Sequence, residues 1–391
     1  METVVAHMDL DAFFVGVERL NNQALVDKPV IIGGMGDRGV VSASSYEART
    51  FGVYSAMPMK LARQLCPQAI YIKGDYDAYS MYSNRVTDLL VQEAPVVEKA
   101  SIDEFYLDLS GMDRYFGTLK FATELRQKVI KETGLALSMG LSVNKTVSKV
   151  ATNEAKPCGQ LEVSRGTERS FLAPLPVSRM PGIGEVTSQK LRNMGIVTLG
   201  TLAEMPKALL VKTFGKAGIS MWERANGIDV SPVMPAYDQK SFSQETTFQT
   251  DTTDMDLLRR VLIGMVEELT QKIRQEQSST GCVSVKLRYS NFDTYVKQTM
   301  LTPTTADNIL IDEVLDLFEK LYDRRLLIRL IGVKFSKLVH GLEQLDLFNS
   351  SARILPLYHI MDGLRRRFGD RIVGRAVSYS FKPKPEKNRA I

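Results

Sequence analysis

The stretch Pro95–Leu109, with the sequence PVVEKASIDEFYLDL, decides the expected fold because it contains two consecutive strand patterns. The segments Pro95–Ala100 and Asp103–Leu109 are rich in β-branched and aromatic residues, and a tight turn at Ser101-Ile102 joins them. A further strand is expected near the start of the chain, at Thr3–Asp9. The two consecutive segments are therefore expected to form a hairpin within a larger sheet.

Helical patterns flank the expected hairpin. Before it, apolar residues recur at spacings of three and four from Tyr79 to Leu90. After it, a helix at Thr118–Lys131 and a strand at Ala136–Val143 complete the order β-α-β-β-α-β. This order is the ferredoxin-like, or split βαβ, arrangement, so we expect an α+β fold. An insertion at about 11–74 separates the first strand from the first helix.

The second half of the chain repeats this order of elements more clearly. The expected elements are the strand Lys240–Gln249, a helix with an apolar stripe from Leu258 to Ile273, the strands Cys282–Tyr289 and Tyr295–Leu301, the helix Ala306–Tyr322 and the strand Leu327–Phe335. Between the two copies, residues 166–233 look helical and short-looped, and Pro232 and Pro235 mark a linker.

The last forty or so residues carry one amphipathic segment and a Lys/Pro-rich end that we expect to be disordered. The apolar residues of the amphipathic segment are Leu357, Ile360, Met361, Leu364 and Phe368.

Composition excludes several classes of protein. Of 391 residues, 44% are hydrophobic and 24% are charged, which is typical of soluble globular chains of two to four domains. No stretch approaches the apolar length of a membrane span, and no secretory signal is visible at the N-terminus, so we expect a cytoplasmic protein. Three scattered cysteines (Cys66, Cys158 and Cys282) and three histidines make a disulfide framework or a His/Cys metal site improbable.

Charge is unevenly distributed along the chain. The net charge is +5, but residues 351–391 contain ten basic and three acidic residues and carry +7, so residues 1–350 carry −2. A basic tail favours a polyanionic partner such as nucleic acid. A solvated tail that keeps the protein soluble explains this feature equally well.

Three carboxylates are the most informative residues. Asp9 ends the first expected strand, and Asp103 and Glu104 begin the strand after the hairpin turn. In a ferredoxin-like sheet these two strands are neighbours, so the carboxylates could converge at one end. Converging carboxylates repel one another, which raises at least one pKa, and a divalent cation removes that conflict. Hard oxygen ligands suit Mg²⁺, and two such ions can support an in-line phosphoryl displacement.

The alternative to a metal site is that these acids have a structural role. Asp residues commonly cap helices, and Asp11 is well placed to N-cap the segment Ala12–Leu20. Basic and aromatic neighbours favour the metal site: Phe13 and Phe14 follow at once, and Arg49 and Lys156 could bind a triphosphate. A lone basic residue is nevertheless more often a surface charge.

Two further segments carry weaker signals for DNA binding. In Pro181-Gly182-Ile183-Gly184, Gly182 and Gly184 would let backbone N–H groups approach a phosphate at a helix N-terminus, although a plain helix–helix turn has the same pattern. Phe214–Gly218 is a weaker candidate of the same kind. Lys286 and Arg288 alternate with the apolar residues of their strand, which indicates a sheet face that meets either solvent or a phosphate backbone.

Together, these segments resemble the Y-family, lesion-bypass DNA polymerases, on the branch of DinB and DNA polymerase IV. Motifs in the order typical of this family extend over about residues 4–340. They are His7–Phe14, Gly39–Ser42 leading into Tyr46–Arg49, Phe51–Val53, Ser55–Pro58, Ser101–Asp108, Ala155–Pro157, Pro181–Gly184 and Ile331–Ser336.

The resemblance implies a right-hand fold with a palm (1–10 and 75–165), fingers (11–74), a helix-hairpin-helix thumb (166–233), a βαββαβ little finger (240–341) and a tail (342–391). It implies that two Mg²⁺ ions are held by Asp9, Asp103, Glu104 and the Leu10 carbonyl, with the three carboxylates forming the catalytic centre. It also implies that Phe14 is the steric gate against ribonucleotides, that Phe13 packs beneath the nucleotide, and that Tyr46, Arg49 and Lys156 bind the triphosphate. One departure is Ala43, where many members have Thr.

A short peptide after the second copy resembles the motif by which bacterial proteins bind the sliding clamp. Its anchors would be Gln344, Leu345, Leu347 and Phe348, although a buried strand end has the same composition. The basic extension that follows could pack on the little finger, touch DNA or bind another repair protein.

The function that these features imply is template-directed, low-fidelity synthesis from dNTPs on primer–template DNA, by a monomer that binds a sliding clamp. Two other classes of function remain open. One is a catalytically inactive scaffold of the same fold, which the three carboxylates oppose. The other is a nucleotide cyclase, because palm-like folds also serve that chemistry.

Overall fold

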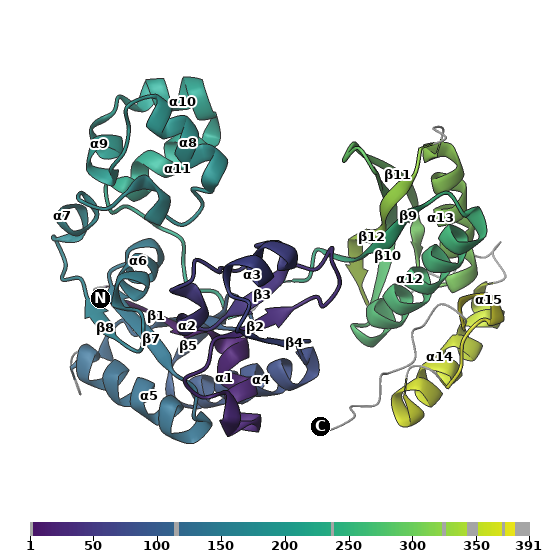
Figure 1. Ribbon diagram of the computed structural model, residues 1–391, viewed down its shortest axis with the longest axis horizontal. Helices are drawn as coiled ribbons and strands as arrows, with labels where there is room; N and C mark the ends of the chain where they lie inside the picture. Colours follow the sequence, from purple (N-terminus) through teal and green to yellow (C-terminus); the bar gives the residue numbers. More distant parts are fainter. Residues whose placement is uncertain are drawn as a thin grey trace. The chain divides into compact units, whose positions relative to one another are not determined.

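The computed structural model describes residues 3–112, 117–235, 238–322, 326–341, 351–369 and 372–379. The chain divides into two compact units, residues 1–237 and 238–391 (Figure 1). Within the described residues, no helix combines the length and the apolar character that a membrane span needs.

The first unit is built around a five-stranded sheet with the order β5-β6-β1-β7-β8. The strands are β1 (Val5–Leu10), β5 (Val96–Lys99), β6 (Glu104–Asp108), β7 (Leu137–Ser142) and β8 (Gln160–Glu162). β1 pairs antiparallel with both β6 and β7, as the predicted ferredoxin-like order requires. The expected elements are therefore confirmed, and β8 adds one strand parallel to β7.

Both faces of this sheet are covered, because alternate residues of β1 point to different cores. Ala6, Met8 and Leu10 join a hydrophobic cluster with α4 (Tyr76–Glu93) and α5 (Thr118–Thr133). His7 points to the opposite face, where its Nδ1 lies 2.8 Å from the Thr152 hydroxyl of α6 (Lys145–Ala155). Asp9 shares the α6 face with His7, so the candidate carboxylates and α6 lie on the same side of the sheet.

Helix α6 was not expected from the sequence. Its start is marked by Asn144, whose side chain accepts a hydrogen bond from the backbone N–H of Val147. Val147, Val150 and Ala151 give it a buried stripe. This stripe is short, so the sequence pattern predicted no helix between the expected strand and the Ala155-Lys156-Pro157 motif.

The insertion folds as a small three-stranded sheet with its own core. Its strands are β2 (Val30–Gly33), β3 (Val41–Ser44) and β4 (Ile70–Ile72), in the order β3-β2-β4. Its helices are α1 (Phe13–Asn21), α2 (Tyr46–Arg49) and α3 (Met59–Leu65). α1 also packs on the first sheet, because Phe13 and Val17 belong to the hydrophobic cluster of that sheet.

The expected helical middle of the chain is confirmed. It consists of α7 (Glu168–Leu172), a 3-10 turn at Val177–Arg179, α8 (Glu185–Asn193), α9 (Leu199–Glu204), α10 (Lys207–Phe214) and α11 (Lys216–Ala225). Asp229, just after α11, accepts hydrogen bonds from the N–H and the hydroxyl of Thr146 in α6. Glu98 of β5 is buried, accepts a hydrogen bond from the N–H of Met234 and pairs with Lys145. The start of the predicted linker is thus fastened to the first sheet.

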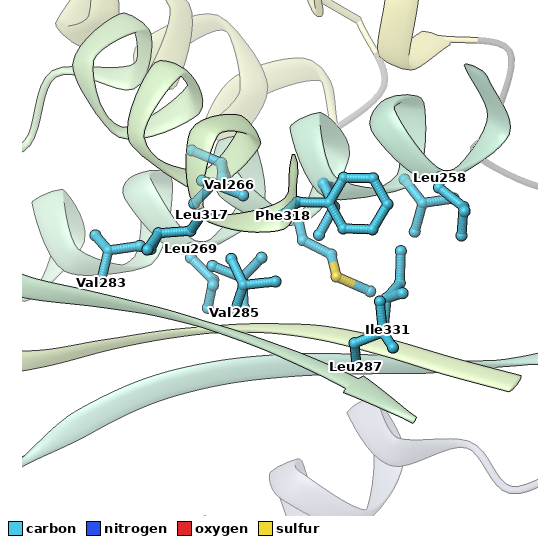
Figure 2. Packing of buried hydrophobic residues seen from close by; sticks show 14 of the residues in the cluster. Leu258, Val266, Leu269, Val283, Val285, Leu287, Leu317, Phe318 and Ile331 are labelled. Atoms are coloured by element: carbon cyan, nitrogen blue, oxygen red, sulfur yellow. The ribbon is translucent and has the colours of Figure 1, made fainter. Parts of the chain in front are cut away.

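The second unit is a four-stranded antiparallel sheet with two helices on one face. Its elements are β9 (Ser241–Thr252), α12 (Met255–Gln275), β10 (Ser278–Tyr289), β11 (Thr294–Thr304), α13 (Asp307–Leu321) and β12 (Ile328–His340), which confirms the predicted second βαββαβ copy. The sheet order is β11-β10-β12-β9. Figure 2 shows apolar side chains from α12, α13, β10 and β12 packed between the helices and the sheet.

The C-terminal extension folds back on this second unit through polar contacts. It contains α14 (Ser351–Phe368) and α15 (Ala376–Tyr379). Asp362 of α14 lies 2.6 Å from the buried guanidinium of Arg274 in α12, which also pairs with Asp307. Ser378 of α15 donates a hydrogen bond to buried Glu267. Of the uses that the sequence analysis left open for the extension, packing on the second unit is the one observed.

The amphipathic segment predicted in the extension is a helix, but most of its apolar stripe is exposed. Leu357, Ile360 and Phe368 are all more than half exposed, whereas Asp362 and Arg365 are buried. An apolar periodicity alone predicts the opposite orientation. The ion pair of Asp362 with Arg274 explains the difference, since it requires the polar side of α14 to face α12.

Candidate active site

The predicted carboxylates meet at the end of the first sheet. Asp9 of β1 is directly opposite Glu104 of β6 in the antiparallel register, so both side chains point to the same face. Asp103 immediately precedes Glu104, and its carbonyl accepts a hydrogen bond of 3.0 Å from the N–H of Leu10. The hydroxyl of Ser101 accepts from the N–H groups of Asp103 and Glu104 and so orders the turn.

Two lysines neutralise this end of the sheet. Lys156 Nζ lies 2.7 Å from Asp9 Oδ1, and Lys149 Nζ of α6 lies 2.7 Å from Glu104 Oε2. Burial raises the pKa of Asp9 to about 7, with Glu104 and Asp103 adding to the rise and Lys156 opposing it. Lys156 therefore offsets the effect of burial on the Asp9 carboxylate only in part.

The residues present fit a hard divalent cation by their chemistry. They offer carboxylate oxygens and a backbone carbonyl, and they concentrate negative charge that burial disfavours. As the side chains stand, however, the described part of the chain contains no group of three or more His, Cys, Asp or Glu side chains arranged to hold a metal ion. Lys156 and Lys149 each contact an oxygen of the acids expected to bind metal.

An aromatic ring at the start of α1, a few residues after Asp9 in the sequence, is stacked on a second ring. Phe14 stacks on Tyr79 of α4, with ring centroids 4.2 Å apart and an angle of 11° between the planes. The Tyr79 hydroxyl donates a hydrogen bond of 2.6 Å to Glu18. Tyr79 was predicted only as a core residue of its helix; its support of Phe14 could not be found from spacing.

Phe13, which the resemblance places beneath the nucleotide, lies in the core of the first sheet. Its side chain is only 3% exposed and belongs to the core beneath the first sheet. Its ring centroid is 5.6 Å from that of Phe14. In this structure Phe13 therefore supports Phe14 from the core and presents almost no surface to a nucleotide.

The predicted triphosphate residues come from two elements. Tyr46 begins α2, and its ring lies under the guanidinium of the exposed Arg49, 4.5 Å from ring centroid to Cζ. Lys156 follows α6 and is turned towards Asp9. Ala43 is buried, and the buried Ser44 donates to the Val53 carbonyl. Ser42, on the other side of Ala43, is exposed.

The capping role expected for Asp11 is wrong. The N-cap residue of α1 is Ala12, which adopts a left-handed conformation with φ 43°, and no side chain caps this helix. Asp11 is buried and instead accepts hydrogen bonds from the Tyr46 hydroxyl (3.2 Å), the Ser138 hydroxyl (2.7 Å) and the Cys158 N–H (2.7 Å). These donors lie 35, 127 and 147 residues away, so no local pattern could reveal them.

Two glycine-containing hairpins of the helical segment lie side by side, Pro181–Gly184 and Phe214–Gly218. Gly182 has φ +90°, a conformation that favours glycine, and Gly184 is the N-cap of α8. A cavity of about 440 Å³ is lined by residues of both hairpins, including Gly182, Phe214 and Ala217. The weaker of the two sequence candidates thus adjoins the stronger one.

The basic residues predicted on β10 are engaged within the second unit. Lys286 Nζ lies 2.9 and 3.0 Å from the carboxylate oxygens of Glu245 on β9, although β12 separates the two strands. The residue between them is Gly332, whose missing side chain leaves room for the contact. Arg288 Nε donates to the Thr294 hydroxyl. The predicted clamp anchors Gln344, Leu345, Leu347 and Phe348 lie outside the described residues.

Comparisons with known proteins agree with this architecture. The impB/mucB/samB family matches residues 8–153, its C-terminal domain matches 239–347, and the IMS family HHH motif matches 165–196. The chain is 38% identical over 382 residues to a DNA polymerase IV of Dehalococcoides mccartyi, covering 97% of this chain and 98% of that relative.

Solved structures give the same result. A Y-family DNA polymerase chimera, Dbh-Dpo4(243-245)-Dbh, matches with a TM-score of 0.76 and 26% identity, over 86% of this chain and 100% of that chain. An insertion ternary complex of Dbh DNA polymerase matches with a TM-score of 0.63 and 27% identity, over the same shares of the two chains.

Three features define the class of this protein: the ferredoxin-like sheet with carboxylates at its end, the inserted small sheet and the second βαββαβ unit. The protein is a Y-family, DNA-directed DNA polymerase. Within that class, the chain belongs to the impB/mucB/samB family and is a DinB-like translesion DNA polymerase.

Proposed function

We propose that Asp9, Asp103 and Glu104, with the Leu10 carbonyl, hold two Mg²⁺ ions and form the catalytic centre of this polymerase. The observation that carries the proposal is the register pair Asp9–Glu104, a buried acid facing a second acid across neighbouring strands. Mg²⁺ bound there would neutralise the phosphates and lower the pKa of the primer hydroxyl. Lys156 and Lys149 would leave the carboxylates and be free to meet phosphate oxygens.

The remaining site residues have positioning roles in this proposal. Tyr46, Arg49 and Lys156 bind the triphosphate: Arg49 and Lys156 carry donors suited to phosphate, and the Tyr46 ring holds the Arg49 guanidinium. Phe14, held in place by Tyr79, forms the floor under the sugar and excludes a 2′-hydroxyl. Orientation and charge neutralisation account for the catalysis, as is general for phosphoryl transfer.

We also propose the boundaries and partners expected from the sequence. Residues 1–10 and 75–165 are the palm, 11–74 the fingers, 166–233 the thumb, and 240–341 the little finger. Gly182 and Gly184 of the thumb would contact the backbone of the primer–template duplex, as would Lys286 and Arg288 of the little finger. The chain would work as a monomer in the cytoplasm.

The experiment that tests the catalytic centre is primer extension by purified protein with one dNTP at a time. Asp103→Ala should reduce extension by at least about a thousandfold, because electrostatic stabilisation of the transition state is lost. Asp108→Ala is the matched control, since Asp108 lies at the other end of β6 and hydrogen-bonds Ser110. Full activity of the Asp103 variant would end the proposal, and no finding favours the inactive scaffold or the cyclase.

Clamp binding is proposed for the peptide 344–348. Gln344→Ala combined with Phe348→Ala should leave basal extension intact and abolish its stimulation by a sliding clamp. Glu343→Ala, one residue outside the motif, is the control and should keep full stimulation. Stimulation of the double variant to the wild-type level would place the clamp contact elsewhere.

A further inference from the structure

Asp11 is a buried acid without an assigned role, placed between the two groups of residues proposed to bind the triphosphate. It lies two residues after Asp9, beyond the end of β1. One carboxylate oxygen, Oδ1, accepts from the Tyr46 hydroxyl of α2. The other, Oδ2, accepts from Ser138 of β7 and from the N–H of Cys158. One side chain therefore connects helix α2 of the insertion, the first sheet and the loop after α6.

The contact with Cys158 bears on Lys156, which lies two residues earlier in that loop. Cys158 is held on both sides, because Arg126 donates to its carbonyl at 2.5 Å while Asp11 accepts from its N–H. Its φ of 48° is unfavourable for a residue with a side chain. Such conformations persist where the surrounding contacts determine them, so Asp11 and Arg126 together fix the path of the loop.

The contact of Asp11 with Tyr46 likewise affects the position of Arg49. The phenol donates to Asp11 while the face of its ring carries the Arg49 guanidinium. Burial, and then the charge of Asp11, raise the pKa of Tyr46 to about 12, so the hydroxyl remains a donor at neutral pH. Arg49 itself is held by its Nε, which donates to the Ser44 carbonyl.

We infer that Asp11 is a positioning residue for the incoming nucleotide: its carboxylate fixes the Tyr46 ring, which carries the Arg49 guanidinium, and the Lys156 loop in one arrangement, so that the triphosphate meets both cations in preformed positions. The inference rests on the proposed role of Tyr46, Arg49 and Lys156. Asp11 itself touches neither metal nor substrate in this assignment. Its loss should weaken nucleotide binding more than it slows the chemical step, because orientation of the phosphates is what it provides.

Asp11→Asn is the sharpest test, since it keeps the shape of the side chain. A carboxylate accepts through both oxygens, but an amide has one oxygen and one NH₂ group, so one set of donors would face another donor. The KM for dNTP should rise about tenfold or more, the effect of losing a hydrogen bond to a charged group. The kcat should change less than about threefold, and the Kd for primer–template DNA should be unchanged. Dissociation constants for dNTP, measured with a chain-terminated primer, should follow KM.

A matched pair of serines on β7 keeps the test valid if Asp11→Asn folds poorly. Ser138→Ala removes a donor to Asp11 and should raise KM in the same direction, by about two- to fourfold. Ser142→Ala is the same change on the same buried strand, but its hydroxyl donates to Val163, so KM should not move. Equal effects of the two serine variants would indicate general loosening and overturn the inference.

A double-mutant cycle separates positioning from simple destabilisation. If Asp11 acts through the Tyr46 hydroxyl, Tyr46→Phe should raise KM less in the Asp11→Asn background than in the wild type. Additive effects would overturn that link. If the wild type extends primers and binds dNTP while Asp11→Asn matches it in KM, only this inference fails. If the wild type does neither, the proposed function fails, and this inference falls with it.

Discussion

Among single residues, Phe14 offers the most direct test, because its proposed role is to exclude ribonucleotides. Its ring is fixed by stacking on Tyr79, so its position does not depend on the nucleotide. Phe14→Ala should remove the clash with a 2′-hydroxyl and raise incorporation of ribonucleotides relative to dNTPs by at least about a hundredfold, the range expected for a well-defined steric contact. Single-nucleotide kinetics with ATP and dATP opposite template thymine measure this ratio.

The control for Phe14 keeps an aromatic ring at that position. Phe14→Tyr should exclude ribonucleotides as well as the wild type does, whereas a sugar selectivity unchanged in Phe14→Ala would remove Phe14 as the gate. Tyr79→Ala should give an intermediate loss of selectivity, since the gate ring would remain but lose its support.

Residue types and spacing predicted the acidic cluster and its neighbours, because β1 and β6 must be adjacent in a ferredoxin-like sheet. The same reasoning failed for Asp11. Asp11 was assigned to its nearest helix, as local rules favour, but its three donors come from distant parts of the chain. Phe13 and Phe14 are consecutive on a helix, and only packing decided which of the two rings is buried.

At the scale of single elements, β12 offers a clear prediction at Gly332. A Cβ added there would lie 2.6 Å from Glu245 Cγ and 3.0 Å from the Gln244 carbonyl. Gly332→Ala should therefore force β9 and β12 apart or expel Glu245 from Lys286. We expect a loss of about 1–3 kcal/mol in the free energy of unfolding, as for other overpacked sites. Urea denaturation measures it.

Gly363 of α14 is the matched control within the same unit. It has open space around its Cα and no positive φ, so an added methyl group meets nothing. Gly363→Ala should leave stability unchanged or raise it by up to about 1 kcal/mol through helix propensity. A Gly332→Ala protein as stable as the wild type would show that the sheet adjusts without cost.

Most elements were predicted within a few residues of their ends, and the errors have physical causes. Strand β10 begins at Ser278 rather than Cys282, because hydrogen bonds to β12 continue beyond the alternating apolar stretch. Helix α6 was missed because its apolar stripe is short. The face that α14 exposes could not be predicted at all, since it depends on Arg274 and Asp362, which are far apart in the sequence.

At the scale of the whole molecule, the two units have separate cores. The largest cluster lies entirely within residues 242–338, and the other clusters lie entirely within the first unit. Residues 1–237 and 238–391 should therefore each fold when expressed alone. Each fragment should show a cooperative thermal transition by circular dichroism.

The first fragment contains every residue proposed to act on the nucleotide. It should extend primers, but its Kd for primer–template DNA should be about a hundredfold higher than that of the full chain, because linked modules bind more tightly than single ones. A fragment 1–237 that is unfolded, or one that binds DNA as tightly as the full chain, would contradict this division of roles.

The overall organisation was predictable because two copies of one element order stand on either side of a helical stretch, and each copy has its own periodic pattern. The role of the tail was not predictable. Its charge of +7 suggested a polyanion, yet in the part that the structure describes Arg375 pairs with Glu267 of the second unit and Arg365 pairs with Asp362. Composition reports how many charges a segment has, but not which of them are already neutralised.

A basic charge is also neutralised within the protein on the sheet surface, where Lys286 contacts Glu245 across Gly332. Because the glutamate sits on the same face as the lysine, the counter-charge for this ammonium group is built into the protein rather than drawn from the solution. Fewer bound anions would be displaced when this face meets a polyanion than its lysines and arginines suggest. Evolution could strengthen the attraction by deleting one acid, without adding a single base.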